Sequence, residues 1–78
     1  MILMSQNKKV IMECSKLIVE KNVSLGKGDK YAIVGIPTVS SLDGAEVLGT
    51  YAEEKLALDE LERIMTALKS GETVNYMK

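Results

Sequence analysis

The segment YAIVGIP, residues 31–37, constrains the fold of this chain more than any other stretch. Successive side chains of a β-strand point to opposite faces of a sheet, and in this segment both sets are apolar. The two sets are Tyr31, Ile33 and Gly35 on one face, and Ala32, Val34 and Ile36 on the other. We therefore expect a strand that is covered on both sides.

A β-hairpin is predicted over residues 30–51. Asp43-Gly44 suits the positive-φ positions of a hairpin turn, and EVLGTY, residues 46–51, then returns antiparallel. The two glycines of SLGKGDK, residues 24–30, indicate a loop before the first strand of the hairpin. The hairpin is therefore the central β element of the predicted fold.

An amphipathic helix is predicted from Ala52 to Ser70, where the apolar residues recur at intervals of three and four. Gly71 suits a left-handed C-terminal cap, and Leu56 lies off the apolar stripe and is expected to be exposed. The expected apolar face consists of Ala57, Leu58, Leu61, Ile64, Met65 and Leu68. The expected solvent face consists of Lys55, Asp59, Glu60, Glu62, Arg63 and Lys69.

The first part of the chain is patterned less clearly. MILM reads as a short strand, and SQNK as a turn, because Ser and Asn side chains bond their own backbone there. The stretch that follows predicts either two strands around Ser15 or one helix over residues 8–21. Its β-branched residues favour the strands. They are Val10, Ile11, Ile18 and Val19.

These elements predict a single α+β domain over residues 1–78. A small antiparallel sheet of about five strands carries one helix, from the C-terminal half of the chain, on one face, and TVNYM adds a short last strand. One helix covers only one face of such a sheet. Ala32, Val34 and Ile36 are then expected to form an exposed apolar patch that a second copy covers, which predicts a homo-oligomer, a dimer or a higher assembly.

Composition limits the chemistry of the chain. It has no histidine and one cysteine, Cys14, so it forms no internal disulfide, and a Ser-His or Cys-His catalytic pair is excluded within one chain. We expect no enzyme, no metal site and no cofactor, with Cys14 as a small core residue. A lone cysteine and an apolar start too short for a signal peptide or a membrane span predict a cytoplasmic protein with no membrane partner.

Charge is distributed unevenly along the chain, whose net charge is −1. Residues 1–30 hold six lysines against three acidic residues, whereas residues 31–78 hold four basic against eight acidic residues. The balance argues against a sequence-independent nucleic-acid binder, and a solvated acidic helix face accounts for most of the asymmetry. A basic surface for an anionic ligand is the alternative.

Candidate ligand-binding residues follow from residue type alone. Lys27 and Lys30 in the glycine-containing loop suit phosphates, and Arg63 is the single guanidinium able to bind a phosphate through two hydrogen bonds. Tyr31 or Tyr76 offers a ring face to a base. The loop lacks the spacing of a phosphate-binding P-loop, so a hairpin connection is the simpler interpretation of it.

Three stretches carry a resemblance to a known group. The opening MILMSQNKKVI, the segment VLGTYAEEKLALDELERIM and the closing VNYMK resemble small uncharacterised proteins of Gram-positive bacteria and their phages. That group begins with M-I-I-x-S-Q-N-K, has a strand ending in L-G-x-Y before a T-E-E-x-A helix start, and ends in Y-x-M-P. The chain departs from it at Glu53 and Lys78, where a helix-capping Thr and a Pro are frequent.

The resemblance implies a phage or prophage protein that acts by binding. Small phage proteins of this size are often anti-defence factors, and one type is a homo-oligomer that sequesters a nucleotide immune signal between its subunits. That function is the leading expectation. The alternative is an inhibitor or adaptor that binds a host protein directly, through the apolar sheet face or the acidic helix. A structural or regulatory phage protein without a small ligand is the third reading.

Overall fold

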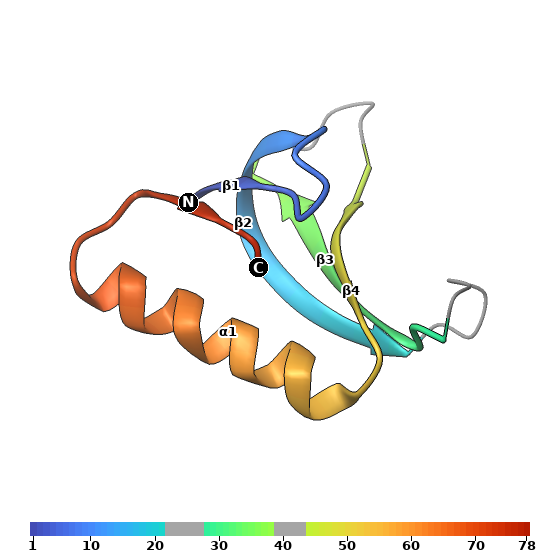
Figure 1. The fold of residues 1–78 in the computed structure, drawn as a ribbon. Helices are drawn as coiled ribbons and strands as arrows, with labels where there is room; N and C mark the ends of the chain where they lie inside the picture. The colour runs from blue at the N-terminus through green and yellow to red at the C-terminus, as the bar shows by residue number, and fades with distance from the viewer. Residues whose placement is uncertain (22–27, 39–43) are drawn as a thin grey trace.

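The computed structural model describes residues 1–21, 28–38 and 44–78 of the chain. These residues form five strands and one helix (Figure 1). The elements are β1 (Ile2–Met4), β2 (Ile11–Lys21), β3 (Tyr31–Pro37), β4 (Glu46–Tyr51), α1 (Glu54–Lys69) and β5 (Val74–Tyr76). The predicted α+β class, the hairpin and the helix in the C-terminal half are confirmed.

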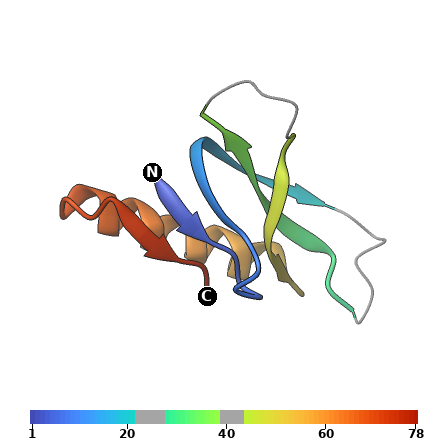
Figure 2. The ribbon, with the colours of Figure 1, turned by 90° about the horizontal axis from the view of Figure 1, so that it is seen from above.

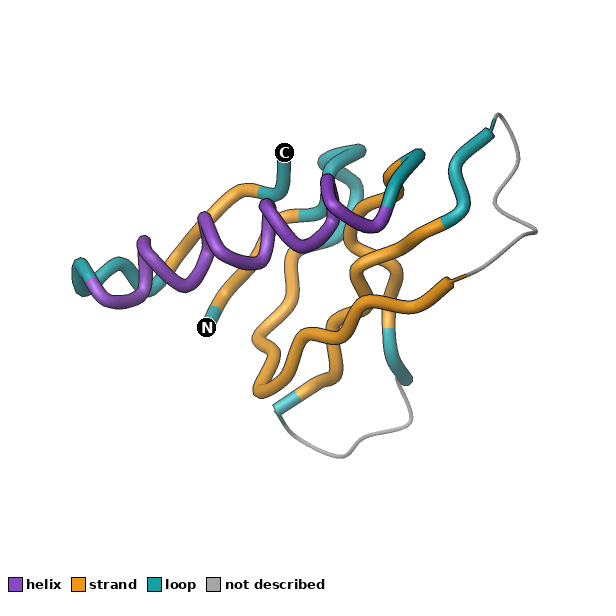
Figure 3. Tube along the Cα trace, turned by 90° about the horizontal axis from the view of Figure 1, so that it is seen from below, coloured by secondary structure: helices purple, strands orange, loops and turns teal. Residues whose placement is uncertain are grey.

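The five strands form one sheet in the order β4-β3-β2-β1-β5 (Figure 2). Neighbouring strands are antiparallel, except that β5 runs parallel to β1. The sheet is mixed because of the connection between its last two strands. Along the chain, α1 follows β4 and precedes β5, and it carries the chain from one edge of the sheet to the other. Sixteen residues at 1.5 Å each give a helix about 24 Å long, enough for that crossing. Figures 1 and 3 show α1 lying across one side of the sheet.

β2 is one long, bent strand. Its first half pairs with β1 and its second half with β3, and the register shifts between Cys14 and Lys16. A bulge of this kind bends a strand and increases its twist. The expected break at Ser15 is therefore present, but as a bulge within one strand, and the alternative of a helix over residues 8–21 is wrong.

The sheet curls until Gln6, two residues after the end of β1, reaches β4. The Gln6 amide N–H donates to the Leu48 carbonyl at 2.7 Å, and the Gln6 side-chain oxygen accepts from the Thr50 amide at 3.0 Å. The predicted turn over SQNK is confirmed, because the Ser5 hydroxyl and the Asn7 side chain accept backbone N–H bonds within it. The curl gives the helix-covered face a concave, barrel-like interior.

The hydrophobic core lies between this concave face and α1. Its centre is aliphatic, since the chain has no Phe or Trp. The buried members are Leu3, Cys14, Ile33, Leu48, Tyr51, Ala57, Ile64 and Met77. The side chains come from every element except β5, which Met77 directly follows, so one core organises the whole described chain.

The face of β3 away from the helix differs from the expectation. Ala32 is 1% exposed and Val34 is 6% exposed in the single chain, and Ile36 is half-buried. Ala32 lies opposite Glu20 on β2 and Thr50 on β4, and the Thr50 hydroxyl donates to Asp29 at 2.8 Å. The expectation that these positions form an exposed patch is wrong, because the single chain already buries two of the three.

The structure confirms the predicted helix cap and describes the predicted loop and hairpin turn only in part. Gly71 has a φ of +89°, so the left-handed cap after α1 is confirmed. In the loop of residues 24–30, Gly28 has a φ of +83°. Asp43, half of the predicted hairpin turn, lies outside the described residues, as do residues 24–27 of the loop.

Candidate functional site

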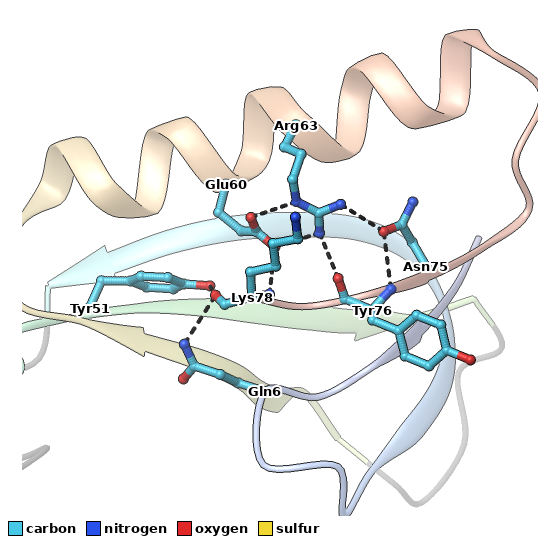
Figure 4. Close-up of polar contacts among 7 residues, drawn as sticks. All are labelled: Gln6, Tyr51, Glu60, Arg63, Asn75, Tyr76 and Lys78. Atoms are coloured by element: carbon cyan, nitrogen blue, oxygen red, sulfur yellow. Dashed lines mark hydrogen bonds and ion pairs between the residues drawn. The ribbon is translucent and has the colours of Figure 1, made fainter.

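The most elaborate group of polar contacts surrounds an ion pair on α1 (Figure 4). Arg63 donates from Nε to Glu60 Oε1 at 2.8 Å and from Nη2 to Glu60 Oε2 at 2.7 Å. The Glu60 side chain is 6% exposed and the Arg63 side chain 29% exposed. Two parallel bonds between a guanidinium and a carboxylate fix the geometry of both groups, so this pair is rigid.

The Glu60–Arg63 pair holds the end of the chain. Arg63 also donates to the Asn75 side chain at 2.9 Å and to the Tyr76 carbonyl at 2.6 Å. Glu60 Oε2 accepts a second bond, from the Lys78 amide at 2.8 Å. Four of the five N–H groups of Arg63 are thus donated within the protein. The pair fastens β5 and the residues after it to α1.

Tyr51 and Gln6 bind the same segment from the other side. The Tyr51 hydroxyl donates to the Lys78 carbonyl at 2.9 Å, and the Gln6 side-chain amide donates to it at 3.1 Å. Burial raises the pKa of Tyr51 to about 12, and the negative charge of Glu60 adds to that effect. Tyr51 therefore stays protonated, and a hydrogen-bond donor, across the physiological range.

An open pocket of about 420 Å³ lies over this network. It is lined by Gln6, Tyr51, Leu56, Asp59, Glu60, Arg63 and Lys78. The hydrogen bonds that Arg63 donates to Glu60 raise the pKa of the Arg63 guanidinium above its usual value, so its positive charge is permanent and faces that carboxylate. With two carboxylates at the pocket and its guanidinium already bound, the site is poorly suited to a phosphate.

The structure separates the residues that the sequence nominated for ligand binding. Lys27 lies outside the described residues. Lys30 is exposed just before β3, and the half-buried Tyr31 packs on the core beneath α1. Tyr76 is 62% exposed, and its side chain lies on the face of the sheet away from α1. Arg63 contacts the backbone carbonyl of Tyr76 and not its ring. Arg63 and Tyr76 are thus neighbours, but Tyr31 and Tyr76 do not share a face.

α1 is rotated about its axis relative to the orientation that its apolar stripe predicts. Glu60, expected in solvent, is buried, as is Ala67. Leu58 and Met65, expected in the core, are 49% and 53% exposed. The rotation turns Glu60 toward Lys78, and two of the six stripe residues, Leu58 and Met65, therefore lie outside the core. An opposite-charge pair at i and i+3 was visible in the sequence, but its burial was not.

The displaced stripe borders a groove of about 240 Å³ between α1 and β2. The groove is lined by Met1, Ser15, Lys16, Leu17, Leu61, Ile64, Met65 and Leu68. Most of these side chains are apolar, and the exposed lysine Lys16 stands at the margin. Such a groove suits an apolar side chain of a partner rather than a charged small molecule.

Reactive groups are scarce in the described part of the chain. Burial raises the pKa of the Cys14 thiol, and the side chain is 1% exposed, so its thiolate is disfavoured. Residues 1–21, 28–38 and 44–78 contain no cluster of three or more cysteine, aspartate or glutamate side chains that could hold a metal ion. Among these same residues, no helix combines the length and the apolar content that crossing a membrane requires.

Comparison with known proteins adds no relative. No family model matches the chain, no curated protein matches it, and no solved structure matches it.

Proposed function

We propose that this chain is a non-enzymatic inhibitor or adaptor that binds another protein along the exposed stripe of α1. One observation carries the proposal: Met65 is about half exposed in the lining of an apolar groove of about 240 Å³, and Leu58, on the same helix, is exposed to a similar degree. In a chain of 78 residues, core material is scarce, and the two large apolar side chains of the helix that lie outside the core lose the stabilisation of burial. A bound partner restores that burial.

The spacing of the stripe supports an amphipathic helix as the bound element. Leu58, Leu61, Met65 and Leu68 follow one another at intervals of three, four and three residues, the spacing of a coiled-coil seam. Helices that dock in grooves use anchors with this spacing. Methionine side chains adapt to different partners, and Lys16 at the margin favours a partner with an acidic residue beside its apolar anchors.

The resemblance to small phage and prophage proteins supports a host protein as this partner, and a cytoplasmic setting. Sequestration of a nucleotide immune signal by a homo-oligomer is the second candidate. The exposed Tyr76 ring favours it, because that ring can stack on a base if a second subunit completes the pocket. The protein-binding function has the stronger support, because four N–H groups of Arg63 are donated within the chain.

The proposal is tested by capture of a host protein on immobilised chain, followed by binding of the purified captured protein. Met65→Glu and Leu58→Glu change exposed positions and leave the core intact, and each is expected to weaken binding at least tenfold. Thr66→Glu is the matched control, because it adds the same charge at an exposed position off the stripe. Equal binding by Met65→Glu, Leu58→Glu and Thr66→Glu contradicts the proposal.

Titration of the same preparations with cyclic dinucleotides, cyclic trinucleotides and ADP-ribose derivatives tests the second candidate. Saturable binding of one nucleotide that Tyr76→Ala weakens and Met65→Glu leaves unchanged favours sequestration over protein binding. Absence of heat across the panel removes sequestration of these nucleotides as a function.

A further inference from the structure

Five apolar side chains and one carboxylate form an array on the sheet face away from α1. The register places Ile11, Met4 and Tyr76 in one row across β2, β1 and β5, and Glu13, Ile2 and Val74 in the next row. Ile11 is 65% exposed, Tyr76 62% and Val74 51%. We call these six residues the back-face array. The back-face array is a different surface from the apolar patch that the sequence predicted at Ala32, Val34 and Ile36 of β3.

Two backbone groups at the edge of the sheet beside the array already have hydrogen-bond partners. The Tyr76 amide on β5 donates to the Asn75 side chain at 3.0 Å, and the Tyr76 carbonyl accepts from Arg63. At the opposite edge, Gln6 binds the Leu48 carbonyl and the Thr50 amide of β4. Side chains that occupy edge groups prevent pairing with another chain. These bonds disfavour association through the edges and favour association through the face of the sheet.

The charges at the two ends of the array are self-complementary. Lys9 precedes Ile11 by two residues and Glu13 follows it by two, and both charged residues are exposed. A twofold axis through Ile11 places Lys9 of each copy beside Glu13 of the other, with Ile11 facing itself at the centre. Among the described residues, the Glu13 carboxylate otherwise pairs only with the Met1 amino group, at 3.4 Å.

We propose that the back-face array binds a second copy of this chain in a twofold-symmetric dimer. The apolar part of the array measures on the order of 400 Å² per copy, which is the size of the largest apolar patch on a typical monomer, and such patches are often interaction sites. Even with its charged rim, a contact of this extent belongs to the smaller class of specific interfaces. The dimer is therefore weak, and its exposed aromatic, Tyr76, lies within the contact. It leaves the stripe of α1 free for the partner proposed above.

The experiment is sedimentation of the full chain from low micromolar to several hundred micromolar concentration. The expected mass rises to twice the 8.5 kDa of one chain. Ile11→Lys is expected to shift the dissociation constant upward at least tenfold. Val47→Lys is the matched control, because Val47 is a 45% exposed residue on β4, at the far end of the strand order. It is expected to keep the mass of the dimer.

A charge exchange tests the symmetry of the contact. Lys9→Glu and Glu13→Lys are each expected to weaken the dimer, because each places like charges together across the axis. The double variant restores the opposite-charge pairing and is expected to recover the affinity of the original chain.

Three results overturn the proposal: a mass of 8.5 kDa at every concentration, a dimer that Ile11→Lys leaves unchanged, or single charge variants that the double variant does not rescue. Met65→Glu is expected to dimerise normally. Failure of the protein-binding proposal is therefore distinguishable from failure of the dimer.

Discussion

Arg63 and Glu60 lie one turn apart on α1 and are joined by two hydrogen bonds of 2.8 and 2.7 Å. The pair sets the rotation of the helix, because a buried carboxylate requires its partners. Turning Glu60 inward to meet the Lys78 amide turns Leu58 and Met65 outward. The contact that fastens the end of the chain is thus also the one that exposes the proposed binding surface.

Removing the guanidinium is expected to destabilise the fold strongly. Arg63→Ala leaves the Glu60 carboxylate buried without its ion-pair partner and frees the Asn75 side chain, and we expect a loss of about 3 kcal/mol in the free energy of unfolding. Urea denaturation measures it. The control is Lys55→Ala, which removes an exposed pair with Asp59 and is expected to cost less than about 0.5 kcal/mol. Equal losses in both variants contradict a structural role for Arg63.

High pH is expected to destabilise the protein through Tyr51. Its pKa is raised from 10 to about 12 in the folded chain, so the unfolded chain releases this proton first as the pH rises. The contribution of Tyr51 to the free energy of unfolding is complete below pH 10 and is lost between pH 10 and about 12. In the double variant Tyr31→Phe, Tyr76→Phe, only Tyr51 absorbs as tyrosinate. A spectrophotometric midpoint near 10 in that variant contradicts the prediction.

A methyl group at Gly49 is expected to displace the Tyr51 ring. A Cβ there lies 2.7 Å from the Tyr51 hydroxyl oxygen, and that hydroxyl is fixed by its bond to Lys78. Gly49→Ala is therefore expected to cost about 1–3 kcal/mol of stability. Gly44→Ala is the control, because a Cβ at Gly44 meets nothing within 4 Å. Thermal unfolding of both variants measures the difference, and equal melting temperatures contradict the close contact.

The turn after β1 stores strain at Lys8. Its φ of +64° lies in the left-handed region, which disfavours residues that carry a Cβ. Lys8→Gly is therefore expected to raise the free energy of unfolding by about 0.5–1 kcal/mol. Lys9→Gly, at the next position, is expected to lower it, because Lys9 lacks a positive φ. A loss of stability in both variants contradicts the assignment of strain to Lys8.

Local patterns predicted the elements of this fold but not their long-range pairing. The hairpin of β3 and β4, the helix and its Gly71 cap depend on neighbours in sequence and were predicted correctly. The direction of β5 was not predictable, because three residues carry little pairing information and α1 decides which edge of the sheet they reach. The burial of Ala32 and Val34 likewise depends on how the neighbouring strands meet in the folded sheet.

The candidate site was predicted less well than the fold. Residue type nominated Arg63 for a ligand, but its donors are bound by Glu60, Asn75 and Tyr76, and these contacts depend on where the end of the chain docks. Alternation shows which residues of one strand share a face. Whether Tyr31 on β3 and Tyr76 on β5 share a face depends on how the strands pair, which the sequence does not give. The rotation of α1 depends on the same docking, so the exposure of Leu58 and Met65 could not be predicted from the spacing of apolar residues in the helix.

The exposure of Met65 tests the central claim of this account most directly. Methyl signals of Met65 and its neighbour Ile64 can be compared by nuclear magnetic resonance in the presence of a soluble paramagnetic probe. We predict strong broadening of the methyl signal of Met65, a residue that is 53% exposed, and little broadening of the methyl signals of Ile64, a residue that is 2% exposed. A protected Met65 methyl, whatever the behaviour of Ile64, contradicts the claim that the apolar stripe of α1 is presented to a partner.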